Sequence, residues 1–73
     1  MIVVTGAAGF IGSYLVGRLN KAGYRDLILV DKIDNPLKEF NLEQKKYRKF
    51  IDRDNFFKWL INHSQEVEFI FHL

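Results

Sequence analysis

The first thirty residues change from a strand-like to a helix-like pattern of apolar positions, and then back again. Residues 1–5 form an apolar, β-branched run, which is typical of a strand. The apolar positions that follow fall at helical spacing, on one face of a predicted helix: Ile11, Leu15, Leu19 and Ala22. We expect this helix to cover about residues 11–21 and to end before Gly23, where a terminal glycine is favoured.

Three further apolar segments indicate strands, and one more stretch indicates a helix. Residues 27–30 are uninterruptedly apolar, which suits a strand buried on both faces of a sheet. Residues 47–51 predict a short third strand, and residues 67–73 predict a fourth. Residues 55–63 predict a second helix with Asp54 as its N-cap. Its expected buried face, with Trp59 at the margin, is Phe56, Phe57, Leu60 and Ile61.

The polar stretch 32–46 separates the second and third predicted strands. It contains Asn35-Pro36, a turn signal, and connections this long are uncommon unless they are functional or partly helical. The order strand–helix–strand–strand–helix–strand predicts an α/β fold with a doubly wound parallel sheet of about four strands and two helices. The polar stretch would then lie over the carboxyl end of the second strand.

Glycine recurs every third residue where the first strand gives way to the helix, at Gly6, Gly9 and Gly12. The first amides of a helix, here those of Phe10 and Ile11, have no partner within the helix and form an anion site with the positive end of its dipole. A Cβ at Gly6 or Gly9 would keep a diphosphate from the backbone, and one at Gly12 would push the helix from the sheet. The spacing G-x-x-G-x-x-G differs from the G-x-G-x-x-G of two-domain dehydrogenases.

The second predicted strand ends in Asp31, nineteen residues after Gly12. This is close to the offset of about 20 residues at which an acidic side chain reaches the ribose hydroxyls of a dinucleotide. The glycine spacing alone is compatible with simple turn chemistry, but its combination with a strand, a helix and this acid predicts dinucleotide binding. Parallel sheets need cover on both faces, and the sequence predicts only two clear helices. We therefore interpret residues 1–73 as the amino-terminal portion of a single, larger Rossmann domain that binds NAD(P).

Composition excludes several other classes of protein. The chain has 73 residues, a net charge of +2 and no cysteine, which fits a reducing cytoplasm and gives no sign of a disulfide framework. No leader is readable, and no apolar segment approaches the roughly 20 residues that span a bilayer. The basic run 45–49 is interpreted as a solvated surface, so neither a membrane nor nucleic acid is an expected partner. His63 and His72 lack companions at metal-ligand spacing, so no metal site is predicted.

These residues resemble the extended short-chain dehydrogenase/reductase family, which contains the NAD-dependent nucleotide-sugar epimerases and dehydratases. The resemblance rests on residues 3–13 with the glycine motif, on Asp31, and on the terminal segment 70–73. It implies that the terminal segment is the fourth strand of the domain. It also implies an NADP or NAD cofactor, a nucleotide-sugar substrate and a homo-oligomer for the whole protein.

The choice between NADP and NAD depends on three cations. The resemblance implies that, in one epimerase subfamily, two lysines hold the 2′-phosphate of NADP. One lysine follows the second strand and the other follows the third. The matching positions are Lys38 and Arg53, where a planar guanidinium replaces the compact ammonium of lysine. Lys32 is a further candidate. Asp31 would repel a 2′-phosphate unless such cations compensate, so NADP is favoured and NAD remains open.

No catalytic residue is predicted within the 73 residues. The family resemblance implies transient oxidation of a sugar carbon by the nicotinamide, carried out with a Ser or Thr, a Tyr, and a Lys four residues after the Tyr. None of the tyrosines, Tyr14, Tyr24 and Tyr47, is followed by lysine at that distance. Three hypotheses remain open for the whole protein: a nucleotide-sugar epimerase, a dehydratase or reductase of the same family, and a non-catalytic NADP-binding protein.

Overall fold

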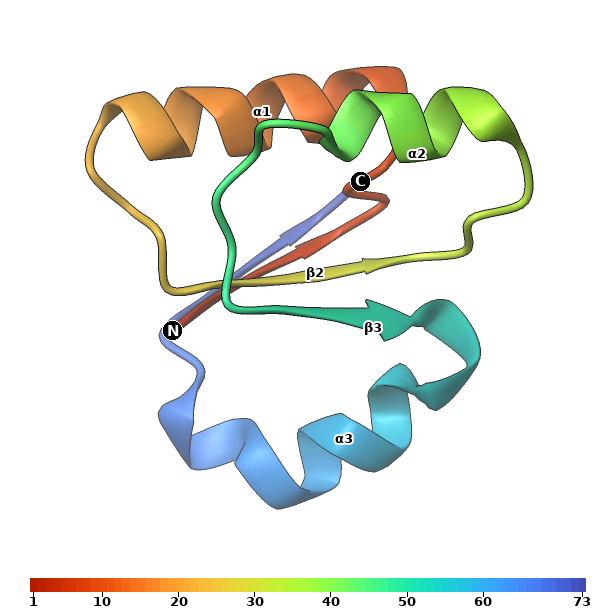
Figure 1. Cartoon of the computed structure of the whole chain (residues 1–73). Coiled ribbons are helices and arrows are strands. Elements are labelled where there is room, and N and C mark those ends of the chain that lie inside the picture. Colours follow the sequence, from red (N-terminus) through yellow and green to blue (C-terminus); the bar gives the residue numbers. More distant parts are fainter.

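The computed structural model describes all residues from Met1 to Leu73, and its centre is a parallel sheet in the order β3-β2-β1-β4 (Figure 1). The strands are β1 (Ile2–Thr5), β2 (Leu27–Asp31), β3 (Lys49–Asp52) and β4 (Phe69–His72). The chain moves from β1 through β2 to β3 in one direction and then crosses back over β1 and β2 to β4. Right-handed crossovers therefore place the connecting helices on opposite faces of the sheet.

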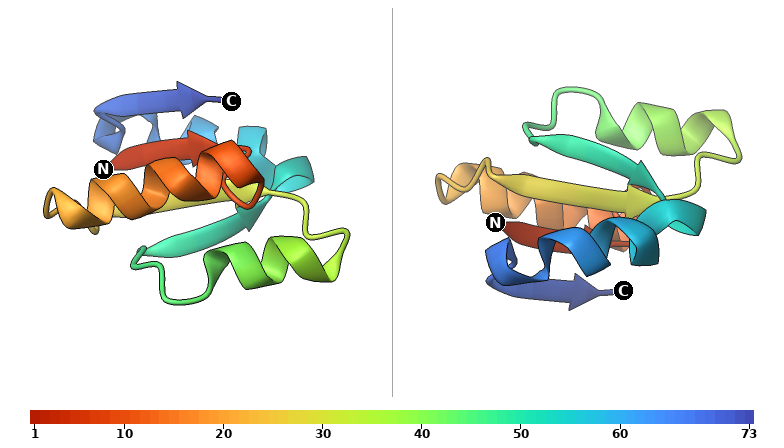
Figure 2. Two further views of the ribbon diagram at one scale, coloured as in Figure 1. Left: turned by 90° about the horizontal axis from the view of Figure 1, so that it is seen from above. Right: turned by 90° about the horizontal axis from the view of Figure 1, so that it is seen from below.

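Three helices cover the sheet: α1 (Phe10–Lys21), α2 (Pro36–Leu42) and α3 (Phe56–His63). Helices α1 and α2 lie on one face and α3 lies on the other (Figures 1 and 2). Short 3₁₀ turns, η1 (Arg53–Asn55) and η2 (Ser64–Glu66), flank α3. The predicted α/β class and doubly wound parallel sheet are confirmed.

The expected number of two helices is wrong, because the polar stretch after β2 contains α2. Asn35 is its N-cap, and the Asn35 Oδ1 atom accepts a hydrogen bond from the Lys38 amide at 3.0 Å. Pro36 occupies the first turn, where its fixed φ suits a helix and its missing N–H costs nothing. The Asn-Pro pair that indicated a turn is therefore a helix start.

Two small cores lie on the two faces of the sheet. Val3, Ile28 and Val30 point toward α3, and Val4 and Leu29 belong to the cluster beneath α1. Strand β2 is buried along its whole length, which explains its unbroken apolar sequence.

The buried faces of two helices agree only in part with those predicted. In α1, Leu15 and Leu19 pack against the core as predicted, but Ile11 is 70% exposed. Ala22 is exposed beyond the end of the helix, and the fully buried residues of α1 are Gly12, Ser13 and Val16. In α3, Phe57 and Ile61 are exposed at 77% and 79%.

The face that α3 turns to the sheet contains Phe56, as predicted, together with Trp59. Trp59, expected at the margin, packs with Phe56 against the core, and His63 stacks on the Trp59 ring with centroids 4.4 Å apart. The helix is thus rotated relative to the prediction.

The predicted N-cap of α3 is also wrong. Asp54 lies inside η1, and its amide donates to Asp52 Oδ1 at 2.9 Å, so that Asp52 is the capping side chain. The residue that precedes α3, Asn55, makes no side-chain cap. The 3₁₀ turn therefore moves the capping position two residues toward the strand.

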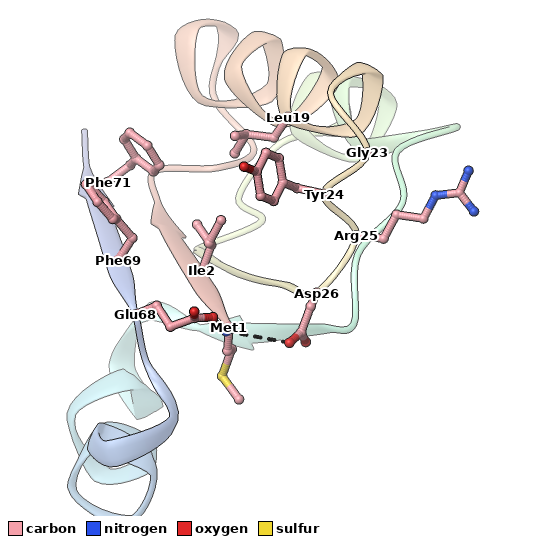
Figure 3. Close-up of a pocket in the computed structure, with 10 residues that line it drawn as sticks. All are labelled: Met1, Ile2, Leu19, Gly23, Tyr24, Arg25, Asp26, Glu68, Phe69 and Phe71. Atoms are coloured by element: carbon pink, nitrogen blue, oxygen red, sulfur yellow. Dashed lines mark hydrogen bonds and ion pairs between the residues drawn. The ribbon is translucent and has the colours of Figure 1, made fainter.

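A cavity of about 650 Å³ lies at the amino ends of the strands, between α1 and the β1–β4 pair (Figure 3). Its wall is mainly apolar and includes Leu19, Tyr24 and Phe69. The Met1 amine at its floor pairs with Glu68 and, at 3.6 Å, with Asp26. This end of the sheet is opposite to the glycine turn. None of the helices has the length and apolar character needed to cross a membrane.

Candidate functional site

The glycine turn lies at the carboxyl end of β1 and leads directly into α1. Gly9 is the N-cap of α1 and has an extended backbone, and its carbonyl accepts from the Ser13 amide at 2.9 Å. The amides of Phe10, Ile11 and Gly12 have no acceptor within the protein, and no side chain caps them. The Phe10 and Ile11 side chains are exposed. The turn therefore presents free donors at the positive end of a helix dipole, which is the chemistry of an anion site.

The three glycines of the turn are required for different reasons. A Cβ on Gly12 would lie 2.0 Å from the Gly6 carbonyl oxygen, so no side chain fits there. Gly6 has φ +66°, and its Cβ would lie 3.1 Å from the Leu73 carbonyl oxygen. A Cβ on Gly9 would make only an ordinary contact of 3.5 Å, and its backbone angles suit any residue. The packing of the chain thus explains Gly6 and Gly12, but it leaves Gly9 unexplained.

Asp31 links the end of β2 to this turn. Its side chain is buried, and Oδ2 accepts from the Ala8 amide at 2.9 Å. Oδ1 accepts from the Lys32 amide at 2.6 Å and from Lys38 Nζ at 3.2 Å. Burial raises the pKa of Asp31, but the hydrogen bonds from the Lys32 and Ala8 amides and from Lys38 outweigh burial and hold that pKa below its ordinary value. Asp31 is therefore a buried carboxylate at neutral pH.

Helix α2 supplies two polar side chains to the same place. Lys38 Nζ contacts Asp31 and the Lys32 carbonyl oxygen at 3.0 Å, and also Asp34 at 3.4 Å. Its hydrogen bond to Asp31 raises the pKa of Lys38 above the ordinary value, so this cation persists beyond neutral pH. Asn41 Nδ2 donates to the Ala8 carbonyl oxygen at 3.0 Å.

The remaining predicted residues lie at the ends of β2 and β3. Lys32 follows β2 and its Nζ forms an exposed ion pair with Asp54 at 3.2 Å. Arg53 follows Asp52, which is paired in register with Asp31 across the β2–β3 ladder. Thus Arg53 starts η1 at the same edge of the sheet as Asp31, with its side chain exposed.

Thr5 connects the start of the glycine turn to the end of β4. Its Oγ1 accepts from the Leu73 amide at 3.2 Å and lies 2.8 Å from His72 Nδ1. These contacts hold β4 beside the turn, at the position where the direction of strand order changes. In doubly wound sheets this crevice at the carboxyl ends is where ligands bind.

The structure thus brings the glycine turn, Asp31 and Lys38 into one cluster and leaves Lys32 and Arg53 on its exposed rim. The role of Asn41 could not be assigned from the sequence, because the pattern of residues 32–46 locates no helix within this stretch. An Asn-Pro helix start would have placed Lys38 and Asn41 on one helical face.

Residues 2–73 match the model of the NAD dependent epimerase/dehydratase family. The chain belongs to this family. Two curated proteins are similar to it over all or nearly all of its length. It is 39% identical over 75 residues to the ADP-L-glycero-D-manno-heptose-6-epimerase of Fusobacterium nucleatum, a match that covers 100% of this chain and 23% of that protein. It is 44% identical over 75 residues to the enzyme of the same name from Brachyspira hyodysenteriae, with 99% and 24% covered.

A solved structure of the same kind is also similar. The crystal structure of UDP-glucose 4-epimerase with UDP-glucose from Thermotoga maritima matches with a TM-score of 0.72 and 34% identity. The match covers 99% of this chain and 23% of that one. The chain therefore spans about a quarter of the length of the family members that it matches.

The residues of this epimerase/dehydratase-family chain fit a dinucleotide. The open position at Gly9, where a Cβ would meet only the Gly6 carbonyl oxygen at 3.5 Å, lies beside free amides that suit a diphosphate. The Asp31 carboxylate lies at the end of the neighbouring strand, where an acceptor for ribose hydroxyls is expected.

Proposed function

We propose that residues 1–73 bind the adenosine and diphosphate portion of NADP or NAD in a nucleotide-sugar epimerase, with ADP-glyceromanno-heptose 6-epimerase as the specific candidate. The observation that carries the proposal is the open position at Gly9, beside free helix amides and next to Asp31. The similarity to two heptose epimerases and to a UDP-glucose epimerase supports the substrate class.

Each predicted residue has a place in this proposal. The backbone of Gly6, Gly9 and Gly12 gives the diphosphate access, and the amides of Phe10 and Ile11 donate to it. Asp31 accepts from a ribose hydroxyl. When bound, the nicotinamide supplies a reversible hydride acceptor for a sugar carbon.

NADP is the favoured cofactor in this proposal because the cation of Lys38 pairs with the Asp31 carboxylate. Lys38 already neutralises Asp31 in the free protein, so a 2′-phosphate would meet an ion pair rather than a bare carboxylate. Lys32 and Arg53 add positive charge at the rim. The 73 residues hold no Tyr-x-x-x-Lys sequence. We therefore assign them to the amino-terminal portion of the NAD(P)-binding domain, a proposal consistent with a span of about a quarter of the relatives.

Two measurements on the full-length protein test the proposal. The first is titration with NADP and NAD, in which Gly9→Val should abolish binding without loss of fold, because the backbone of Gly9 accepts a β-branched residue. Unchanged affinity would reject the diphosphate role of the turn. The second is incubation with ADP-glyceromanno-heptose: inversion at C6 supports the specific candidate, whereas an elimination product or no turnover contradicts it.

A further inference from the structure

Ala8, at the middle of the glycine turn, has both of its backbone polar atoms bonded to side chains from other elements. Its amide donates to Asp31 Oδ2 at 2.9 Å, and its carbonyl oxygen accepts from Asn41 Nδ2 at 3.0 Å. The residue itself is completely buried. Two side chains, from the end of β2 and from α2, therefore fix the orientation of this residue.

The Asn41 contact controls the peptide group that joins Ala8 to Gly9. On the opposite edge of this group, the Gly9 amide donates to the Gly6 carbonyl oxygen at 3.2 Å. Because Gly9 lacks a Cβ, rotation of this peptide meets little steric resistance. Its orientation therefore depends on these two hydrogen bonds, and it directly precedes the amides that begin α1.

Asn41 and Lys38 lie three residues apart on α2, so they lie on one face of that helix. Lys38 holds Asp31 Oδ1, while Asp31 Oδ2 holds the Ala8 amide. The contacts form a closed ring that runs from α2 through Asp31 and Ala8 and returns to α2. Helix α2 thus holds the glycine turn directly through Asn41 and indirectly through Lys38 and Asp31.

We propose that Asn41 is a positioning residue for the dinucleotide diphosphate. Its side-chain amide fixes the Ala8–Gly9 peptide, and through it the free amides at the start of α1. The proposal rests on the function proposed above. Asn41 acts on the part of the ligand that NAD and NADP share, so its loss weakens both to a similar extent, unlike loss of Lys38.

The test uses the full-length protein with four variants at two positions. Asn41→Leu removes the donor at similar volume, and Asn41→Ala repeats the test if the leucine variant does not fold. Asn41→His keeps an N–H donor at the same branch point of the side chain. Asn62→Leu makes the same change on exposed α3, on the other face of the sheet. Two quantities are measured: the dissociation constants of NAD and NADP, and amide hydrogen exchange at Gly9 in the ligand-free protein.

We expect Asn41→Leu and Asn41→Ala to raise both dissociation constants and to accelerate exchange at Gly9, each by roughly five-fold or more, as for loss of one hydrogen bond. Asn41→His should keep the dissociation constants and the exchange rate at Gly9 close to those of the wild type. Asn62→Leu should change neither quantity. Unchanged exchange at Gly9 in the Asn41→Leu and Asn41→Ala variants would overturn the proposal. A loss of affinity that is larger for NADP than for NAD, as expected for Lys38→Ala, would also overturn it. If the wild type binds neither dinucleotide, the proposed function falls, and the exchange data still decide whether Asn41 holds the turn.

Discussion

Asp31 Oδ2 and the Ala8 amide nitrogen lie 2.9 Å apart, although the two residues are 23 positions apart in the sequence. This hydrogen bond joins the end of β2 to the glycine turn that follows β1. It uses one carboxylate oxygen, while the other oxygen accepts from Lys38. The acid therefore organises the protein itself, in addition to any ligand that it contacts.

Replacing Asp31 should change how stability depends on pH. The folded-state pKa of Asp31 is lowered, so its charged form stabilises the protein above the ordinary aspartate pKa of about 3.9, and this contribution is lost as the pH falls through the folded value. Asp31→Asn should lower the free energy of unfolding at pH 7 and should lose less stability than the wild type between about pH 5 and pH 2. Urea unfolding at a series of pH values measures this.

The control for Asp31 is Asp34→Asn. Asp34 also contacts Lys38, but its side chain is mostly exposed, so the variant should keep the acid dependence of the wild type. Parallel pH profiles for wild type and Asp31→Asn would contradict the assignment of the acid-sensitive contribution to Asp31.

Gly12→Ala should strongly destabilise the fold. The new Cβ would lie 2.0 Å from the Gly6 carbonyl oxygen and 2.9 Å from the Ala7 Cα, and both are backbone atoms that cannot move independently. A loss of about 3 kcal/mol or more in the free energy of unfolding is expected, as for severe overpacking. Chemical denaturation measures it.

Gly17→Ala is the matched control on the same helix. There the new Cβ would meet only the flexible end of Lys45, at 3.4 Å. Alanine is the better helix former, so we expect stability to be unchanged or raised by up to about 1 kcal/mol. Equal losses at positions 12 and 17 would show that close helix–turn packing is not the cause.

Lys38→Ala should weaken NADP more than NAD. The lysine is the cation nearest to Asp31, and loss of one charge-assisted hydrogen bond to a 2′-phosphate corresponds to roughly a ten-fold rise in the dissociation constant. Lys58→Ala, an exposed change on α3, should leave both affinities as they are. Equal losses of affinity for the two cofactors would contradict a contact between Lys38 and the 2′-phosphate, and would leave the ion pair with Asp31 as its only role.

Thr5→Val should loosen the attachment of β4 to the glycine turn. Valine keeps the β-branched shape but cannot accept from the Leu73 amide or bond with His72. A loss of about 1 kcal/mol in unfolding free energy is expected, with faster amide exchange in β4. Thr5→Ser retains the hydroxyl and should preserve slow exchange; equal exchange rates for both variants would exclude the hydroxyl as the cause.

The parallel sheet was predictable from the alternation of strand and helix signals, whereas the strand order β3-β2-β1-β4 comes from the structure. The uninterrupted apolar run indicated that β2 is covered on both faces, and the change to helical spacing indicated β1 and α1. The glycine turn and Asp31 were predictable for a related reason. Both lie where strands end, and the carboxyl ends of parallel strands share one edge of the sheet.

The orientation of the helices was not predictable from apolar spacing alone. Phe57 and Ile61 match the helical pattern as well as Phe56 and Trp59 do, and only the shape of the sheet beneath decides which pair is buried. The Asn41 contact was missed for another reason. It depends on α2, whose start was interpreted as a turn, so the face that it shares with Lys38 was not considered.

The difference between Gly12 and Gly9 bears on how such a protein can change over generations. At position 12 even the methyl group of alanine would require α1 to move away from the turn, so every substitution there disturbs the packing of the fold. At position 9 the fold accepts a side chain, and under the proposed function only nucleotide binding would be lost. A substitution at position 9 can therefore produce a folded protein without the proposed binding, whereas a substitution at position 12 disrupts the fold itself.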